Sequence, residues 1–321
     1  MQSARLIKPR QWELLDLDIP TAMDGQMLVR LERTAICGTD KSAWIGLAGD
    51  YPLAPGQSGH EGMGIVESCP SGRYAVGERV LLYGFDRPLF QQYVLADDDG
   101  GCIRLPADGD ADVILMSQLF GTVLHAFYKL DPVIGQDVVV LGQGPVGQLF
   151  NAALRNLGAR RIIAVDPLAH RLEIASRMGA THTLLSGAGL VEQVRSLGGG
   201  ELPPLVVEAV GKQESFQLAA SLLRRNGTLL YFGVPNKEEG RGVMSLDFLR
   251  MFVNETRIIT TVGPNPHFDY SPALQWITEG RIDVRPMLTH VMPFAEIQQA
   301  FTMAFDEPEK HGAVKVVMSF D

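Results

Sequence analysis

The stretch "VVVLGQGPVGQLF", residues 138–150, decides the fold that the sequence predicts. Its apolar beginning is typical of a buried strand, and the glycines that follow have the spacing G-x-G-x-x-G. Beyond the first two glycines, apolar side chains recur at helical spacing at Val146, Leu149, Phe150, Ala153, Leu154 and Leu157. A strand that ends in these glycines and opens an amphipathic helix is the context in which the pattern indicates a dinucleotide-binding turn.

Each glycine of this turn has a separate physical task in such a site. Gly142 makes the tight turn, Gly144 lets the backbone approach a pyrophosphate, and Gly147 lets the helix pack on the strand. The pyrophosphate would lie at the positive N-terminus of the helix, where Pro145 and Val146 complete the predicted cofactor-binding loop. The competing interpretation is a glycine turn in a methyltransferase or in another nucleotide-like domain.

The next predicted strand, "RIIAVD" at residues 161–166, ends in an acidic residue at the distance expected of a ribose-binding site. Asp166 would accept hydrogen bonds from a ribose 2′-hydroxyl and would repel a 2′-phosphate, so NAD is favoured over NADP. Arg171 lies close enough in the sequence to leave NADP open as the alternative.

Around this segment, from about residue 111 to residue 262, short apolar strands alternate with helical patterns. Such alternation predicts a parallel, doubly wound sheet of the Rossmann type. The first third of the chain instead has the pattern of short strands and loops, because "QMLVRLERTAI" at 26–36 alternates with a period of two. After residue 264 the pattern is mixed, and we expect this short tail to pack back on the N-terminal strands.

The composition limits the class of protein. The 321 residues are enough for two domains, and 46% hydrophobic with 20% charged residues is typical of a soluble globular enzyme. A net charge of -9 without a long basic run argues against nucleic acid and acidic membranes as partners. Three widely spaced cysteines predict no disulfide framework and favour a reducing compartment.

No stretch of the sequence predicts a membrane or export segment. The N-terminus lacks the apolar core of a signal peptide, and "VILMSQLFGTVLHAFY" at 113–128 is too short and too polar to span a bilayer. We expect this stretch to form a buried helix and the protein to be cytoplasmic.

A second group of residues indicates metal chemistry. Cys37 lies in "AICGTDKSAW", and His60 and Glu61 lie in the glycine-rich "GQSGHEGMG". Thiolate, imidazole and carboxylate are the ligand types that zinc takes, and a catalytic zinc needs three of them and an open position. The spacing is not that of a zinc finger, and Cys37 alone would more readily be an inert buried thiol. A histidine and glutamate side by side among glycines are harder to explain as core residues.

At this point the sequence resembles the zinc-dependent medium-chain dehydrogenase/reductases, close to the polyol, sugar and threonine dehydrogenase branch. The resemblance implies a GroES-like, mainly β catalytic domain in two pieces, residues 1–116 and 264–321, around an NAD-binding Rossmann domain at 117–263. The motifs that carry it are "CGTD" (37–40), "GHEGMGIV" (59–66), "VGERV" (76–80), "LHA" (124–126), "VLGQGPVG" (140–147), "VEAVG" (207–211), "LTH" (288–290) and "AVKVV" (313–317).

The resemblance also implies a ligand set. Cys37 and His60 fall on zinc-ligand positions, and Glu61 is a direct ligand in the polyol and sugar branch. Gln118 occupies the place of a further ligand and could bind through its carbonyl oxygen or hold a water molecule. Thr39 matches the hydroxyl that takes the alcohol proton. One thiolate and one carboxylate would balance the charge of the metal.

Two departures from the family narrow the expectation. The cysteine-rich lobe that holds a structural zinc is replaced by "FDRPL", so we expect one catalytic zinc per chain. The relay histidine of many members falls at Ser42, so the proton must leave by another route. Trp44 could line the substrate pocket or belong to the core. His125 has the features of a satisfied helix histidine, and Asp40 could be an ordinary turn residue.

The predicted activity is the NAD-dependent, zinc-dependent interconversion of a secondary alcohol and its ketone. The substrate would be a small hydroxylated molecule such as a polyol, sugar or hydroxy amino acid, and the protein a homodimer or homotetramer. One alternative is a zinc-free, NADPH-dependent quinone or enoyl reductase on the same fold. Another is a non-catalytic nucleotide-binding protein, with Gln118 and Ser42 as signs of a decaying site, although the intact Cys37, His60 and Glu61 argue against it.

Overall fold

The computed structural model describes residues 1–47, 49–84, 87–235 and 242–321, and the chain forms two compact units. The first unit consists of Met1–Leu119 and Leu288–Asp321, and the second consists of Phe120–Met287. The division predicted from the sequence, at residues 116/117 and 263/264, concerns functional domains and stays a prediction. In the part of the chain that is described, no helix combines the length and apolar character needed to cross a membrane.

The first unit is built on a seven-stranded sheet in the order β14-β15-β3-β4-β5-β7, with β6 paired to β3 outside this path. Apart from the parallel pair β14 and β15, its neighbours are antiparallel. The strands are β3 (Gln26–Ala35), β4 (Gly62–Ser68), β5 (Arg79–Leu82), β6 (Tyr93–Asp97), β7 (Cys102–Arg104), β14 (Leu288–Pro293) and β15 (Lys315–Ser319).

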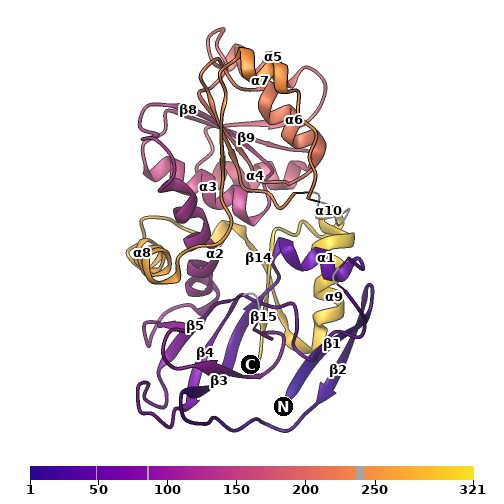
Figure 1. The fold of residues 1–321 in the computed structure, drawn as a ribbon, viewed down its shortest axis with the longest axis vertical. Coiled ribbons are helices and arrows are strands. Elements are labelled where there is room, and N and C mark those ends of the chain that lie inside the picture. The colour runs from indigo at the N-terminus through magenta and orange to yellow at the C-terminus, as the bar shows by residue number, and fades with distance from the viewer. Residues whose placement is uncertain (48, 85–86, 236–241) are drawn as a thin grey trace. The chain divides into compact units, whose positions relative to one another are not determined.

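The C-terminal tail packs on the N-terminal strands, as the sequence predicted. Strand β15, yellow in Figure 1, lies beside β3, with Met318 opposite Thr34. Alternate residues of β3, namely Met27, Val29 and Leu31, enter the core of the sheet. The period of two in this strand therefore separates a buried face from a more polar one.

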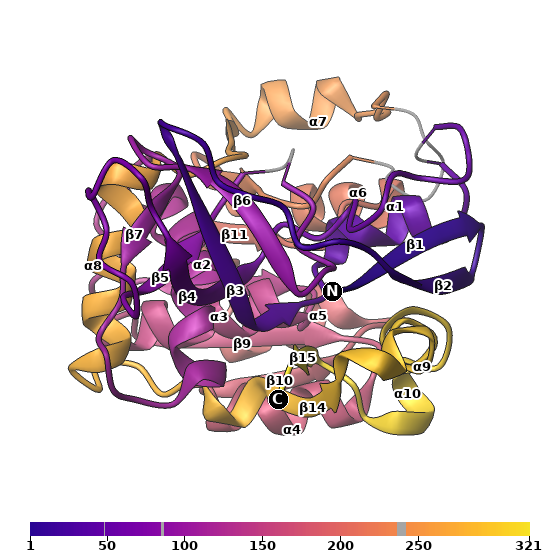
Figure 2. The same ribbon diagram turned by 90° about the horizontal axis from the view of Figure 1, so that it is seen from below.

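Smaller elements surround this sheet. The strands β1 (Gln2–Lys8) and β2 (Gln11–Asp16) form the antiparallel hairpin visible in Figure 2. Trp12 of this hairpin packs against Phe301, with ring centroids 4.9 Å apart. The helical elements are η1 (Gly38–Asp40), α1 (Lys41–Trp44), η3 (Phe294–Glu296), α9 (Ile297–Phe301), the π-helical turn η4 (Thr302–Asp306) and α10 (Pro308–His311).

The second unit contains a six-stranded parallel sheet in the order β10-β9-β8-β11-β12-β13. This order confirms the predicted Rossmann-type fold, because it reverses direction at β8, the strand that ends in the glycine turn. The strands are β8 (Asp137–Leu141), β9 (Arg161–Asp166), β10 (His182–Leu185), β11 (Leu205–Glu208), β12 (Thr228–Tyr231) and β13 (Arg257–Thr260).

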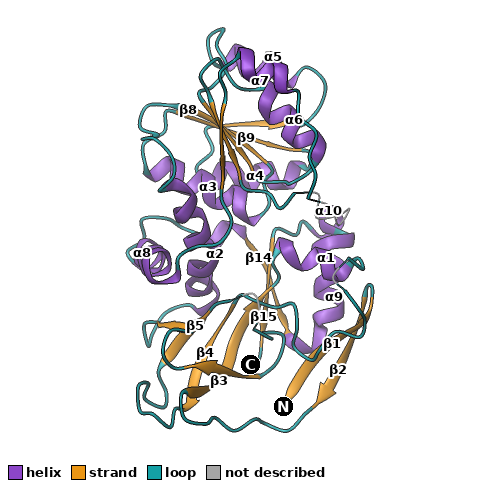
Figure 3. Cartoon of the chain, viewed as in Figure 1, coloured by secondary structure: helices purple, strands orange, loops and turns teal. Residues whose placement is uncertain are grey.

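Helices cover both faces of this parallel sheet (Figure 3). Val139 and Val165 pack toward α5 and α6 on one face, and Ala164 packs against α4 on the other. Burial on both faces explains why the central strands are almost continuously apolar. The helices are α3 (Pro145–Asn156), α4 (Ala169–Arg177), α5 (Leu190–Leu197), α6 (Gln213–Ser221), α7 (Phe248–Val253), α8 (Pro266–Thr278) and the 3₁₀ turn η2 (Arg285–Met287).

The helix α2 (Ala111–Phe127) begins in the first unit and ends in the second. It is the buried helix expected from the apolar stretch at 113–128. Asp110 begins it by accepting hydrogen bonds from the backbone N–H groups of Asp112 and Val113, at 3.0 and 3.4 Å. A carboxylate at this end satisfies otherwise unpaired N–H groups and interacts favourably with the helix dipole.

Candidate metal centre and dinucleotide loop

The pairing of β3 with β4 brings the candidate metal ligands together. Cys37 lies just after the end of β3, and His60 and Glu61 directly precede β4. The two strands are antiparallel, so the end of one lies beside the beginning of the other. The backbone carbonyl of Glu61 accepts hydrogen bonds from Ala35 N and from Thr34 Oγ1, at 3.0 and 2.9 Å. These bonds fix the position of Glu61 relative to the cysteine.

The three side chains form a compact group of donor atoms. The Cys37 sulfur, one ring nitrogen of His60 and one carboxylate oxygen of Glu61 all lie within 4.8 Å of one another. The histidine and glutamate are buried, and the cysteine is partly buried. One thiolate, one imidazole and one carboxylate are a donor set that suits zinc, with a fourth position left for another ligand.

Only one of the two carboxylate oxygens of Glu61 has a hydrogen-bond partner. Its Oε2 accepts a hydrogen bond from Lys315 Nζ at 2.5 Å, and both side chains are 0% exposed. The same Nζ donates to the carbonyl of Ile36 at 2.9 Å. Glu61 Oε1 is buried and has no hydrogen-bond partner. A buried carboxylate oxygen without a partner is costly, and a metal ion beside the cysteine and histidine would satisfy it.

The ring of His60 is oriented by groups on both sides. Its Nδ1 lies 3.1 Å from the carbonyl oxygen of Ser58 and 3.5 Å from Asp40 Oδ1. Its Nε2 lies 3.2 Å from Thr39 Oγ1. Metal-binding histidines commonly donate one ring N–H to a carbonyl or carboxylate and bind the metal through the other nitrogen. The arrangement therefore leaves Nε2 as the candidate ligand atom, beside the Thr39 hydroxyl.

Asp40 is a buried partner of this group rather than an ordinary turn residue. Its Oδ2 accepts the backbone N–H of Cys37 at 2.8 Å, and burial raises the pKa of its carboxyl. Burial also opposes the charged form of His60, but the charges of Cys37 and Asp40 outweigh this and raise the pKa of His60 well above its ordinary value. Lys315 and Asp40 carry formal charges of opposite sign, so together they leave the formal charge of the group unchanged.

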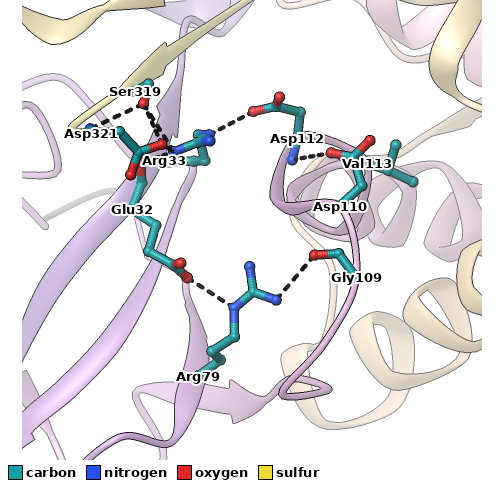
Figure 4. A network of polar contacts seen from close by, with 9 residues as sticks. All are labelled: Glu32, Arg33, Arg79, Gly109, Asp110, Asp112, Val113, Ser319 and Asp321. Atoms are coloured by element: carbon teal, nitrogen blue, oxygen red, sulfur yellow. Dashed lines mark hydrogen bonds and ion pairs between the residues drawn. The ribbon is translucent and has the colours of Figure 1, made fainter.

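Gln118 is buried on α2 in the same unit, and its ligation of a metal stays a prediction. The first turn of its helix is fastened to the sheet by the network in Figure 4. Arg33 Nε on β3 donates to Asp112 Oδ1 at 2.7 Å. Arg79 on β5 donates to Glu32 Oε2 at 2.9 Å and to the carbonyl of Gly109 at 3.3 Å.

A tryptophan and a histidine that the sequence left open, Trp44 and His125, have structural roles. Trp44 is fully buried, with its ring 5.4 Å from that of Phe301 and its Nε1 donating to Asp306 at 3.0 Å, so it belongs to the core. His125 Nδ1 lies 3.0 Å from Asp269 Oδ2, which makes it a satisfied helix histidine, as its sequence context indicated.

Gly142 and Gly147 have the tight-turn and close-packing geometry that the sequence predicted, and the role of Gly144 stays a prediction. Gly142 has a φ of 89°, a conformation that glycine adopts without strain. A Cβ on Gly147 would lie 1.8 Å from the carbonyl oxygen of Gly142, so only glycine allows this approach. A Cβ on Gly144 would meet nothing within 4 Å, which leaves the loop open at the helix N-terminus formed by Pro145 and Val146. An open helix N-terminus suits a pyrophosphate.

Asp166 lies at the end of β9 and is bonded to the glycine turn. Its Oδ2 accepts the backbone N–H of Gln143 at 2.7 Å, and its Oδ1 accepts that of Leu168 at 2.9 Å. The guanidinium of Arg171 lies 3.8 Å from the same carboxylate. Each carboxylate oxygen retains a further lone pair, so the group can still accept a ribose hydroxyl.

Two further residues of these sites were not predicted from the sequence. Lys315 is the first residue of β15 and interrupts the apolar sequence "AVKVVM" at 313–318, and a charged residue within such a run is a signal that could have been noticed. Gln143 is a fully buried amide within the glycine turn, where the pattern specifies only the glycines.

Comparisons with known proteins agree with this arrangement. The sequence model described as alcohol dehydrogenase GroES-like domain matches residues 23–107, and the one described as zinc-binding dehydrogenase matches residues 145–279. The chain is 28% identical to an alcohol dehydrogenase of Cupriavidus necator, covering 99% of this chain and 98% of that protein. It is 29% identical to "Probable D-xylulose reductase A" of Arthroderma otae, over 89% of each chain.

A solved structure shares the fold. The alcohol dehydrogenase TADH from Thermus sp. ATN1 superposes with a TM-score of 0.85 at 22% identity, covering 100% of both chains. Two sequence models of one family match in order along the chain, and relatives match over nearly its whole length. The chain belongs to the zinc-type medium-chain dehydrogenase family.

Proposed function

We propose that this oxidoreductase uses zinc and NAD to interconvert a secondary alcohol and its ketone by hydride transfer. The observation that carries the proposal is the group formed by Cys37, His60 and Glu61, with its donor atoms within 4.8 Å and one carboxylate oxygen left without a partner. The relative named as a D-xylulose reductase supports a polyol or sugar as substrate. A hydroxy amino acid is retained as a third substrate class.

The residues of the first unit would divide the work at the metal. Cys37, His60 and Glu61 hold the ion, with Gln118 as a fourth ligand or as the holder of a water molecule. A bound zinc ion supplies Lewis acidity, which lowers the pKa of a coordinated hydroxyl. Thr39, whose Oγ1 lies 3.2 Å from His60 Nε2, would take the hydroxyl proton of the substrate while giving up its own towards solvent, so that it relays the proton and does not keep it.

The residues of the second unit would bind the dinucleotide. The glycine turn receives the pyrophosphate at the N-terminus of α3, and Asp166 accepts the ribose hydroxyls. The carboxylate disfavours a 2′-phosphate, so NAD is the proposed cofactor, and Arg171 is the residue through which NADP could compete. The first and second units would then correspond to the catalytic and cofactor-binding domains.

A second copy of the chain is the proposed partner. Strand β13 pairs only with β12 among the described residues, so one edge of the parallel sheet is open. Next to it in the sequence, α7 exposes Phe248, Leu249, Phe252 and Val253. Two-fold symmetry would place two such edges antiparallel and cover both helices, since the same surface meets itself in a symmetric dimer. We also propose a cytoplasmic location, because all three cysteines are free thiols.

Metal analysis together with a substrate screen tests the proposal. Purified protein should contain about one zinc per chain, as expected for a single three-ligand catalytic site. Polyols, sugars and hydroxy amino acids would be offered with NAD and with NADP. Protein that binds no zinc, yet reduces a quinone or an enoyl substrate with NADPH, would favour the zinc-free reductase instead.

Replacement of Cys37 tests whether metal binding in the first unit and cofactor binding in the second unit are independent. Cys37→Ala should abolish zinc binding and alcohol oxidation because it removes one of three protein ligands. NADH binding, measured by fluorescence titration, should remain, since the glycine turn belongs to the other unit. Cys69→Ala is the matched control, because Cys69 lies outside the group of candidate ligands. Retained zinc in the Cys37→Ala protein would contradict the proposed ligand set.

A further inference from the structure

A buried glutamine links the two halves of the candidate cofactor site. Gln148 directly follows the last glycine of the turn and is 0% exposed. Its Nε2 donates to the backbone carbonyl of Gln143 at 3.0 Å and to that of Arg171 at 2.9 Å. The first carbonyl lies inside the glycine turn, and the second lies in the first turn of α4. A single amide therefore connects two segments that are not adjacent in the sequence.

The turn itself is held by side chains within the protein. Gln143 is fully buried, and its Nε2 donates to the carbonyl of Val140 at 2.9 Å. Its Oε1 accepts a hydrogen bond from Asn151 Nδ2 at 2.7 Å, and its backbone N–H donates to Asp166 at 2.7 Å. The shape of the turn is thus set before any ligand arrives, and Asp166 is part of the same set of bonds.

The other end of the link carries the second candidate group for the adenosine ribose. Arg171 places its guanidinium 3.8 Å from Asp166 Oδ2, and its Nε is buried without a hydrogen-bond partner. The direction of this side chain depends on where the backbone of α4 lies. Because Gln148 bonds to the carbonyl of Arg171 itself, it fixes that backbone relative to the glycine turn.

We propose that Gln148 is a positioning residue that couples the pyrophosphate-binding turn to the Asp166–Arg171 pair that recognises the ribose. This inference rests on the proposed binding of a dinucleotide. A dinucleotide contacts both places at once, so its affinity depends on their separation being correct in the free protein. Preorganisation of this kind raises affinity by reducing the ordering cost of binding. It also makes discrimination between NAD and NADP depend on a residue that touches neither ribose nor phosphate.

The chemistry of the position explains why an amide is needed there. Gln148 is as buried as its neighbours Leu149 and Phe150, and its Oε1 has no hydrogen-bond partner. Only the two bonds that its Nε2 donates offset the cost of burying the amide. An apolar residue at 148 would remove the donor that joins the two carbonyls and leave both segments free to shift. Buried polar groups of this kind are retained when their bonds are specific, because each one left unsatisfied is costly.

The test compares Gln148→Met with a control that destabilises the same helix without touching the link. Leu154→Val is that control, since Leu154 is a fully buried residue of α3 and Leu→Val removes one methylene. Dissociation constants of NADH, NADPH, ADP-ribose and adenosine would be measured by titration of the full-length protein. We expect Gln148→Met to raise the NADH and ADP-ribose constants about tenfold, a change that corresponds to the loss of one or two buried hydrogen bonds.

The pattern across ligands separates positioning from a general loss of structure. Adenosine carries the ribose but no phosphate, so it reaches only one side of the link and should lose affinity about twofold or less. The ratio of the NADPH to the NADH constant should fall, and zinc content should stay unchanged. Equal losses in Gln148→Met and Leu154→Val, or an unchanged NADH constant in Gln148→Met, would overturn the inference.

A double-mutant cycle provides a second readout. If Gln148 acts through the ribose-recognising pair, the effect of Asp166→Asn on NADH binding should be smaller in the Gln148→Met background than in the wild type. If the two substitutions change the NADH dissociation constant by independent factors, so that the double variant shows their product, coupling between Gln148 and Asp166 is refuted. A wild-type protein that binds neither NADH nor NADPH would instead refute the proposed function, so the two failures are distinguishable.

Discussion

The buried pair of Lys315 and Glu61 is the residue-scale feature with the largest expected energetic effect. Both side chains are 0% exposed, and removal of one partner leaves an uncompensated charge in the interior. Lys315→Met should therefore lower the free energy of unfolding of the metal-free protein by about 3–5 kcal/mol. Zinc should restore part of this loss, because the ion neutralises the carboxylate that the lysine no longer pairs.

Chemical denaturation with and without zinc measures both effects. Lys310→Met is the matched control, since Lys310 forms an exposed ion pair with Glu307 at 2.8 Å. Exposed pairs contribute little to stability, so the control should change the denaturation midpoint far less. Equal midpoint shifts in the two variants would show that the buried pair contributes no more to stability than the exposed pair.

Cofactor choice is also argued at the scale of one residue. Asp166→Ser removes the negative charge that opposes a 2′-phosphate and leaves Arg171 free to meet one. The ratio of kcat/KM for NAD to that for NADP should fall by about tenfold or more, equivalent to roughly 1.4 kcal/mol. Asp137→Ser controls for loss of a buried aspartate, because Asp137 pairs with Arg160 at the opposite end of the parallel strands. Equal use of both cofactors by the wild type would contradict the assignment.

At the scale of elements, α2 depends on the arginines that fasten its first turn. Arg33 bonds to Asp112 on α2, to Ser319 at the end of β15 and to Asp321 beyond it, at 2.7, 2.9 and 2.6 Å (Figure 4). Arg33→Met should destabilise the first unit by about 1–2 kcal/mol, after allowance for partial exposure. Arg30→Met, on the same strand, removes only an exposed pair with Glu67 and should cost less. Thermal unfolding of both variants checks the difference.

The strands that could be predicted best from the sequence are those whose residues are almost all buried. The strand predicted at 161–166 has the same bounds as β9. The pattern of "SFQLAASLLRRNG" at 215–227 predicts a helix that ends at Gly227, but α6 ends at Ser221, and Leu222 and Leu223 pack in the core after its end. The edge strands β10 and β13 were not recognised, since an edge strand is exposed and lacks a continuous apolar run.

At the scale of the whole molecule, long-range pairing decides which site residues a sequence can reveal. Cys37, His60 and Glu61 could be suspected because their residue types suit one metal, and in the fold they flank the paired strands β3 and β4. Lys315 meets Glu61 from 254 positions away, through the pairing of β15 with β3. No local pattern specifies that pairing, so Lys315 stands out in its apolar run but could be identified as the partner of Glu61 only in the folded chain.

The exposed face of α7 carries the prediction about assembly. Phe248 and Phe252 are each 71% exposed, and together they would bury roughly 200–350 Å² in a contact, a substantial share of the roughly 800 Å² that one partner contributes to a stable interface. The wild type should therefore sediment as a dimer or a larger even assembly. Phe252→Glu should yield monomers, because it places a charge on the surface that would be desolvated.

The fold of the variant should survive, because Met251 is the residue of α7 that is buried and it is left in place. Val76→Glu is the matched control, since Val76 is also 71% exposed but lies in a turn of the first unit. It should leave the sedimentation coefficient unchanged. A monomeric wild type, or a Phe252→Glu protein that still associates, would mean that α7 and the open edge of β13 do not form the interface. The apolar face would then need a different partner.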